Sequence, residues 1–467
     1  MRVVDRGSKV AVARLYGARP RWAAVVGALD NVPWVIVVAV GLVARVVADL
    51  AFPAAGVDLY EFGVIAKNID MGRGFAYFAA TPSGVAVDSA HTGTPLPSAF
   101  MPPLYTGAVF VAVAVARLLD ASPDAVVWFL RIINLGLAAA TTLGLARLVC
   151  LVASARPARL AALGFAVYPA FVYQATQASA SNAYLAVEVW LLALCAALAK
   201  RVTIGRLLAA GLLAGLLGLL RAEAGLLVLA LAVWLTCFAG AGQLRFRRRL
   251  AVGAAFLGVA LLLPGGWLVR NSMLFDRPVI TITTTGGFNL WIGNHPGATG
   301  SQKEYSVPDS LAVRISAVPP STDYELDRDA VFAEAAQEEI VANPLGTILR
   351  DGKKLLMMLG VDPYDDRSGH PIYLMAYAVL VALGLGGAVA WWCDNSASKC
   401  NARRTHTTLL GGWVVLSIAV PIVFFALARY QLPLELSLVV GSAILLAHVG
   451  ARTKKSQQPS TQAPTRY

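Results

Sequence analysis

Eleven apolar segments, most of them close to the length that crosses a bilayer, constrain this chain more than any other feature. The segments are 33–52, 103–119, 126–146, 160–176, 183–199, 206–220, 223–240, 250–268, 371–392, 407–428 and 432–450. A transmembrane helix needs about 20 apolar residues. With 57% hydrophobic and 14% charged residues, the chain has too few charges to cover a soluble domain. The sequence predicts an all-α polytopic membrane protein with about 10–11 transmembrane helices.

Basic residues gather in short clusters between these segments, which predicts the topology. The clusters are residues 1–21, Arg147/Arg156/Arg159, Lys200/Arg201/Arg206, Arg245/Arg247/Arg248/Arg249, Lys399/Arg403/Arg404 and Arg452/Lys454/Lys455. Loops rich in Lys and Arg stay on the cytoplasmic side, so we expect both termini in the cytoplasm. We expect a multi-pass protein of the plasma (inner) membrane, with two large non-cytoplasmic loops at 53–102 and 271–370. The net charge of +12 is dispersed in this way and forms no single patch, so we expect no nucleic-acid partner.

The number of crossings before residue 147 is uncertain by one. Both 1–31 and 147–159 should be cytoplasmic, which requires an even number of crossings, but three apolar segments lie between them. The segment 103–119 is the shortest of the three and begins with Pro102-Pro103. We expect it to lie at the outer membrane face or to re-enter, which gives ten spans. The alternative is that the charge rule fails at one loop, which gives eleven.

The expected organisation has five parts. They are a basic cytoplasmic N-terminus (1–32), an N-terminal transmembrane module (33–270) that includes an outer loop (53–125), a large non-cytoplasmic loop (271–370), C-terminal transmembrane helices (371–450) and a basic cytoplasmic tail (451–467). Within the second loop, residues 325–358 place acidic residues first and basic residues last, which suits a helix dipole. Asn343-Pro344 should break or kink that helix. No internal repeat is visible, which weakens a transporter interpretation.

Two acidic residues directly after the first span are the first candidates for chemistry. Asp58 and Glu61 are three residues apart, so a helix there would place both carboxylates on one face. Paired carboxylates can divide the work of a base and of a positioning group, and charge at a membrane surface is costly to desolvate. The alternative is that Asp58 only caps a surface helix.

Three arginines at the expected outer ends of spans are candidates for binding a phosphate. They are Arg221, Arg270 and Arg429, and the planar fork of donors in arginine suits phosphate. A membrane anchor or a polar turn is the plainer explanation of each. The histidines make no zinc spacing, and Asp362, Asp365 and Asp366 more often indicate a solvated loop than a cation site. No motif requires a cofactor; a divalent cation is possible but nothing supports one.

Several short motifs, taken in order, resemble one family of membrane enzymes. They are Asp58 with Tyr60/Glu61, Asn68, Gly72-x-Gly74-Phe75, Pro102-Pro103-Leu104-Tyr105, Leu219-Leu220-Arg221-Ala222-Glu223, Pro264 to Asn271, Gly287 to Asn294 and Arg429-Tyr430 before Pro433. Each alone is weak. In this order they resemble the GT-C fold integral-membrane glycosyltransferases, and more narrowly the relatives of protein O-mannosyltransferases and lipid A aminoarabinose transferases.

The resemblance implies transfer of a sugar from a polyprenyl-phosphate-linked donor on the non-cytoplasmic face, usually with inversion. The acceptor would be an unidentified glycan, lipid or protein, and membrane lipids would surround the donor's tail. Asp58 would be the general base, with Glu61 orienting the acceptor. Arg270 would bind the leaving phosphate, with Arg221 and Arg429 as weaker candidates. Tyr60, Asn68 and Tyr105 would contribute to substrate binding, and no metal ligands are implied.

Two other classes remain open from the sequence. A transporter or flippase for a lipid-linked sugar would also need cations at the outer face, but would not need a carboxylate in the first outer loop. A non-catalytic membrane scaffold would use the outer loops to bind a partner.

Overall fold

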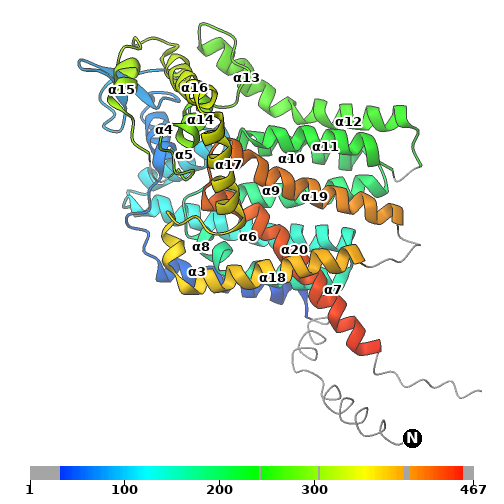
Figure 1. The fold of residues 1–467 in the computed structure, drawn as a ribbon. Coiled ribbons are helices and arrows are strands. Elements are labelled where there is room, and N and C mark those ends of the chain that lie inside the picture. The colour runs from blue at the N-terminus through cyan, green and yellow to red at the C-terminus, as the bar shows by residue number, and fades with distance from the viewer. Residues whose placement is uncertain (1–31, 241–242, 303–304, 394–399, 456–467) are drawn as a thin grey trace, which may run out of the picture.

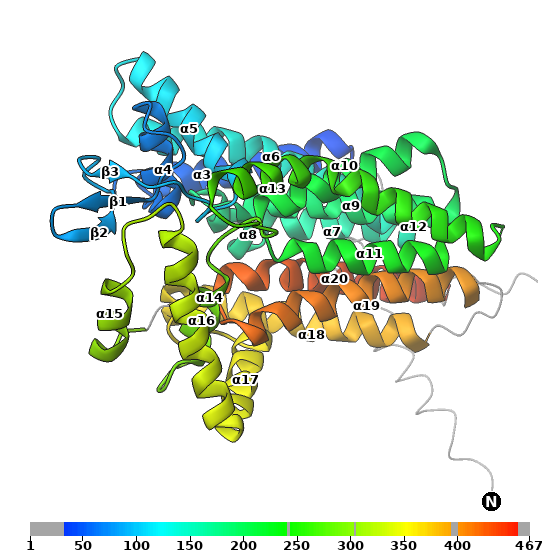
Figure 2. The same cartoon turned by 90° about the horizontal axis from the view of Figure 1, so that it is seen from above.

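The structure is a computed structural model that describes residues 32–240, 243–302, 305–393 and 400–455. Residues 1–31 of the predicted basic N-terminus (1–32) and residues 456–467 of the predicted tail (451–467) lie outside these residues, and residues 451–455 belong to the last helix. Helices dominate the fold and form a bundle, and the two long segments between spans lie together at one end of it (Figures 1 and 2). The bundle helices are α3 (Trp34–Ala51), α6 (Asp124–Val152), α7 (Ala155–Val167), α8 (Pro169–Ala175), α9 (Ser181–Lys200), α10 (Ile204–Leu220), α11 (Ala224–Phe238), α12 (Phe246–Ala260), α13 (Leu262–Leu274), α18 (Pro371–Cys393), α19 (Cys400–Val423) and α20 (Ala428–Lys455).

These helices confirm an all-α polytopic membrane protein and correct several predicted spans. Among the described residues, six helices are long and apolar enough to cross a membrane alone, and a seventh span results if α12 and α13, which meet at 48°, are counted as one. The predicted span 160–176 is divided between α7 and α8, because Pro169 has no N–H to continue the helix. Helices α10 and α11 are short apolar helices of 17 and 15 residues.

Helix α5 (Pro103–Leu118) packs along α4 (Tyr60–Asp70), a short amphipathic helix of the first outer segment. Near its start, Tyr105 meets Phe62 edge to face with ring centroids 4.9 Å apart. Near its end, the Arg117 guanidinium lies 2.8 Å from the Asp70 carboxylate. A 16-residue helix rises about 24 Å, so a crossing would carry its far end away from α4. The pairing therefore favours the expected position of 103–119, at the outer membrane face or re-entering, over the alternative of an eleventh span.

The first outer segment also contains a small sheet that the sequence did not lead us to expect. Its strands β1 (Phe78–Thr81), β2 (Gly84–Val87) and β3 (Thr94–Pro95) are antiparallel in the order β2-β1-β3. Arg73 holds the sheet by donating from Nη2 to Asp88 Oδ2 and to the Gly93 carbonyl, both at 2.6 Å. Gly84 follows the β1–β2 turn with φ +119°, a conformation that favours glycine.

The second outer segment is helical and contains α14 (Gly286–Asn294), α15 (Asp309–Ser316), α16 (Tyr324–Ala342), α17 (Pro344–Leu359) and the 3-10 helix η2 (Asp366–Gly369). The predicted break at Asn343-Pro344 is confirmed, since α16 ends and α17 begins there. The Asn343 side chain caps α17 by accepting from the Gly346 N–H at 2.9 Å, and Pro344 occupies the first helical position, where its missing N–H costs nothing.

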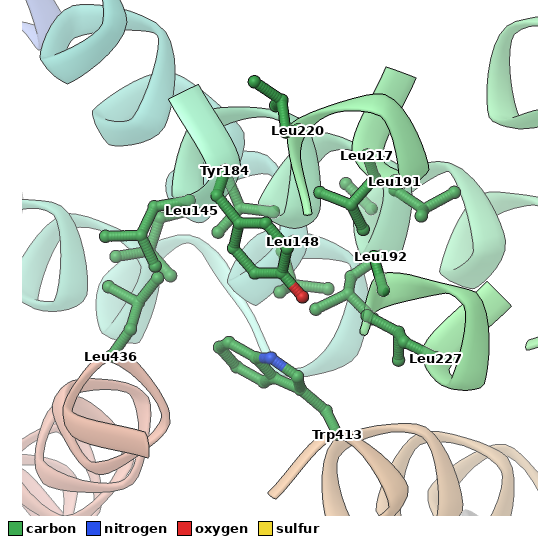
Figure 3. Close-up of a cluster of buried hydrophobic side chains, with 14 of the residues drawn as sticks. Leu145, Leu148, Tyr184, Leu191, Leu192, Leu217, Leu220, Leu227, Trp413 and Leu436 are labelled. Carbon is green, nitrogen blue, oxygen red and sulfur yellow. The ribbon is translucent and has the colours of Figure 1, made fainter. Parts of the chain in front are cut away.

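The core lies between helices of both halves of the chain. Leucines of α6, α9, α10, α11 and α20 surround Tyr184 and Trp413 (Figure 3). Because small alanines fill much of the remaining interface, the helices approach closely, as is common in membrane bundles. This packing fixes the ends of α9, α10, α11, α19 and α20 around one space, which is the candidate site.

Candidate functional site

One large cavity, of about 830 Å³, lies where the two outer segments meet the ends of the bundle helices. Five of the eight predicted site residues line it, and they come from three separate parts of the chain. They are Asp58, Tyr60, Glu61, Arg221 and Arg429. The fold therefore brings the predicted carboxylates and two of the predicted phosphate-binding arginines into a single site.

Asp58 lies in the chain that leads from α3 into α4. Its Oδ1 accepts a hydrogen bond from the backbone N–H of Tyr60 at 2.7 Å. The cap position of α4 is Leu59, and no side chain caps the helix, so Asp58 orders the turn before α4 and is not its N-cap. Tyr60 adopts φ +51°, which is uncommon for a non-glycine residue and concentrates at functional sites. Asp58 is exposed and Glu61, in the first turn of α4, is half-buried. One oxygen of Asp58 orders the turn, and the carboxylate still faces the cavity.

Arg221 is held rigidly at the junction of α10 and α11. Its guanidinium lies 5.0 Å from the ring centroids of both Tyr184 and Tyr430. Its Nη2 donates to Ser181 Oγ at 2.8 Å, and Nη1 is 3.7 Å from the Glu223 carboxylate. Planar stacking of this kind suits arginine and orients its donors. Arg221 is thus a fixed positive charge at the cavity wall.

Arg429 differs from Arg221 because, among the described residues, it forms no ion pair and no side-chain hydrogen bond. It lies 5.7 Å from the Tyr430 ring centroid at the start of α20. A third arginine of the cavity, Arg367, is paired with Asp365 at 2.8 Å. Arg429 therefore has the least compensated positive charge of these three and is the one most open to an anionic ligand.

The three other predicted residues lie outside the cavity. Arg270 donates from Nη1 to the Ser98 carbonyl at 2.6 Å and stacks on Trp267 at 4.5 Å. Asn68 is fully buried and donates to the Ala76 carbonyl at 2.9 Å. Tyr105 is buried and packs against Phe62, which does line the cavity. The substrate-binding roles expected for Arg270, Asn68 and Tyr105 stay predictions; in the structure these side chains contact the chain around the cavity and do not line it.

A buried carboxyl group joins the two outer segments next to Arg270. Glu325, on α16, accepts from Ser98 Oγ at 2.7 Å and from the Ala99 N–H at 2.8 Å. Burial raises the pKa of Glu325 to about 7, against the opposite effect of these two donors and of Arg270. These hydrogen bonds join the first outer segment to α16, and their acceptor, the Glu325 carboxyl group, is titratable.

Sequence reasoning missed several residues of the cavity. Glu188 is the only acidic residue in α9 and is 1% exposed; a carboxyl group within a predicted span is a signal that could have found it. Asn289 also lines the cavity and belongs to the motif Gly287 to Asn294. Trp413, Tyr305 and Arg367 line it as well, but nothing in the local sequence distinguishes these three. No group of three or more His, Cys, Asp or Glu residues able to hold a metal ion occurs within the described part of the chain.

Together the helices and the cavity define a polytopic membrane protein with its candidate site at one end of the helix bundle. The comparison with solved structures places it beside the archaeal oligosaccharyltransferase AglB from Archaeoglobus fulgidus, solved with an inhibitory peptide and a dolichol-phosphate. That match has a TM-score of 0.52 at 14% identity and covers 93% of this chain and 52% of that one. The predicted fold class is therefore confirmed, and this chain spans about half the length of the archaeal protein.

Two further solved structures are similar. An oligosaccharyltransferase from Archaeoglobus fulgidus in complex with Zn and sulfate matches with a TM-score of 0.52 at 16% identity, over 89% of this chain and 49% of that one. ArnT from Cupriavidus metallidurans bound to undecaprenyl phosphate matches with a TM-score of 0.37 at 15% identity, over 92% and 81%. No protein-family model and no curated protein matches the sequence.

Proposed function

We propose that this protein is a membrane glycosyltransferase that moves a sugar from a polyprenyl-phosphate donor to an acceptor hydroxyl on the non-cytoplasmic face. The observation that carries the proposal is the composition of the cavity: Asp58 and Glu61 enter it from the first outer segment, and Arg221 and Arg429 enter it from the ends of α10 and α20. A base for an acceptor and cations for a leaving phosphate thus share one space.

In the proposed reaction Asp58 is the general base. Its carboxylate removes the proton of the acceptor hydroxyl as the oxygen attacks the anomeric carbon of the donor sugar. A new bond forms between that oxygen and the carbon, and the bond between the carbon and the phosphate oxygen breaks. The backbone hydrogen bond from Tyr60 fixes Asp58 in place, and Glu61 orients the acceptor. An in-line attack inverts the anomeric carbon.

Arg429 and Arg221 stabilise the lipid phosphate that leaves. Negative charge increases on the phosphate oxygen as the bond to the sugar breaks, so guanidinium donors aimed at that position lower the barrier. Arg221 is oriented before substrate arrives by its stacking on Tyr184 and Tyr430, which reduces the reorganisation needed during the reaction. Both arginines lie next to the ends of bundle helices, where a lipid phosphate group would be located.

The proposed cellular setting follows from the charge pattern. The basic clusters support a proposal in which both termini are cytoplasmic and the cavity opens on the opposite face of the plasma (inner) membrane. The dolichol-phosphate in the similar archaeal structure belongs to the class of lipid carrier that the proposed donor would use. The acceptor could be a lipid, a glycan or a protein, and the proposal requires no cofactor.

Transfer in proteoliposomes tests this proposal. The purified protein is reconstituted with undecaprenyl phosphate bearing radiolabelled glucose, mannose or arabinose, and a membrane lipid and glycan extract serves as the acceptor. Release of labelled sugar from the lipid, either to acceptor or to water, supports a transferase. Movement of intact labelled lipid across the bilayer without release would instead indicate a flippase, and neither release nor movement with any donor would indicate a scaffold.

A further inference from the structure

We propose that the floor of the cavity is the subsite that binds the sugar ring of the donor. The floor is formed by Tyr184 and Glu188 of α9 and Trp413 of α19, all of which line the cavity. The inference rests on the function proposed above and adds the position of the sugar and the groups that bind its hydroxyls.

The floor lies deeper in the bundle than the arginines. Ser181, the first residue of α9, accepts a hydrogen bond from Arg221 Nη2, so α9 begins at the level of that guanidinium. Glu188 follows seven residues later, which is about 10 Å along a helix. A donor whose phosphate contacts Arg221 can therefore place its sugar towards Glu188.

Two polar groups of the floor lack partners among the described residues. Glu188 is 1% exposed and its Oε2 has no hydrogen-bond partner; Trp413 is 1% exposed and its indole Nε1–H has none. The indole N–H lies close enough to the Glu188 carboxyl group to act on it as a hydrogen-bond donor, although this contact falls outside hydrogen-bond geometry. Leaving a buried polar group unpaired destabilises the protein, and more so if the group is charged. A ligand that satisfies one acceptor and one donor at the same place would remove that cost.

The chemistry of the floor matches a carbohydrate better than a hydrocarbon tail. A sugar hydroxyl can donate to Glu188 Oε2 while a neighbouring oxygen accepts from Trp413 Nε1. Figure 3 shows Tyr184 and Trp413 approaching each other from α9 and α19, with leucines around them. These rings offer apolar faces to the C–H groups of a sugar, and Leu220 and Leu227 limit the access of water. A prenyl chain would leave both polar groups unpaired.

A comparison of two ligands tests the subsite. Binding of undecaprenyl phosphate, and of undecaprenyl phosphate bearing glucose, mannose or arabinose, is measured to the full-length protein in nanodiscs. The wild type should bind at least one sugar-bearing lipid more tightly than the bare lipid. Glu188→Leu should reduce that preference by about 10- to 100-fold and Trp413→Phe by about 2- to 10-fold, while affinity for the bare lipid stays within about twofold and reports correct folding.

Glu435→Leu is the matched control. Glu435 is also a buried glutamate in the bundle with an unpartnered Oε2, but it contacts the Tyr373 hydroxyl and does not line the cavity, so the sugar preference should survive its removal. If the lipids bind and Glu188→Leu keeps the full sugar preference, or weakens both lipids equally, the subsite is wrong and the proposed function stands. If the wild type binds neither lipid, the proposed function fails and the subsite with it.

Discussion

Replacing Glu325 by glutamine should remove a pH dependence from the stability of this protein. Glu325 is 2% exposed and receives hydrogen bonds from Ser98 and Ala99, so it joins α16 to the first outer segment. Its pKa is raised from the ordinary value of 4.5 to about 7, chiefly by burial. Glutamine keeps the shape and the acceptor oxygen but cannot ionise.

The direction of the pH dependence follows from the pKa of Glu325 in the unfolded chain, 4.5, and in the folded protein, about 7. Between about pH 4.5 and pH 7 the folded protein retains a proton on Glu325 that the unfolded chain has released, so raising the pH favours unfolding. A difference of about 2.5 pKa units corresponds to about 3 kcal/mol, since one unit is about 1.4 kcal/mol. The stabilisation is fully present below pH 4.5 and is lost as the pH rises through 7.

Thermal unfolding in nanodiscs, followed by tryptophan fluorescence from pH 5 to pH 8, measures this effect. The wild type should lose stability across that range, and Glu325→Gln should show a distinctly shallower slope. Asp327→Asn is the matched control, because Asp327 lies on the same helix, is exposed and pairs with Arg277 at the surface. A wild-type profile that is flat, or a Glu325→Gln profile as steep as the wild type, would refute the reasoning.

Two further predictions concern residues inside and outside the cavity. Arg429→Ala should weaken binding of undecaprenyl phosphate by about 10- to 100-fold, because a charge-assisted hydrogen bond contributes about 1.5–3 kcal/mol. Equilibrium binding in nanodiscs measures this change, with the surface variant Arg314→Ala as the control. Equal affinities of Arg429→Ala and the wild type would count against the phosphate role. Asn68→Ala should lower the free energy of unfolding by about 1–3 kcal/mol, because the Ala76 carbonyl loses its donor. Transfer per folded molecule should stay within about twofold, and a selective loss of transfer would return Asn68 to the site.

Much of the fold could be predicted because it depends on local patterns. Apolar runs of bilayer length predict helices, and Asn343-Pro344 predicts the break between α16 and α17. The break at Tyr168-Pro169 between α7 and α8 carried the same signal and was overlooked. The sheet of β1, β2 and β3 is harder to predict from sequence than the helices. Its strands are only two to four residues long, and Arg73 holds it through contacts with Asp88 and Gly93.

Site residues could be predicted where a charged side chain lies at the end of an apolar segment, because burying charge there costs free energy. They could not be predicted in polar segments, where charged side chains are common. Asp58 and Arg221 stand out because they lie at the ends of apolar segments, and both line the cavity. Arg270 has the same sequence signal, but the fold turns its guanidinium to the Ser98 carbonyl. Which arginine faces a cavity depends on the packing of segments distant in sequence. Tyr305 lies in a loop and Arg367 in the short 3-10 helix η2, and no single-sequence pattern at either place indicates a role.

The most direct test of the central proposal is sugar transfer by Asp58→Asn at equal abundance in proteoliposomes. Asparagine is also a favoured residue at the start of a helix and can accept the Tyr60 N–H hydrogen bond, so α4 should remain in place while the base is lost. General base catalysis contributes about 10²- to 10⁴-fold, and we predict a loss of at least about 100-fold in transfer with donor binding retained. Transfer within about twofold of the wild type would contradict the assignment of Asp58 as the base.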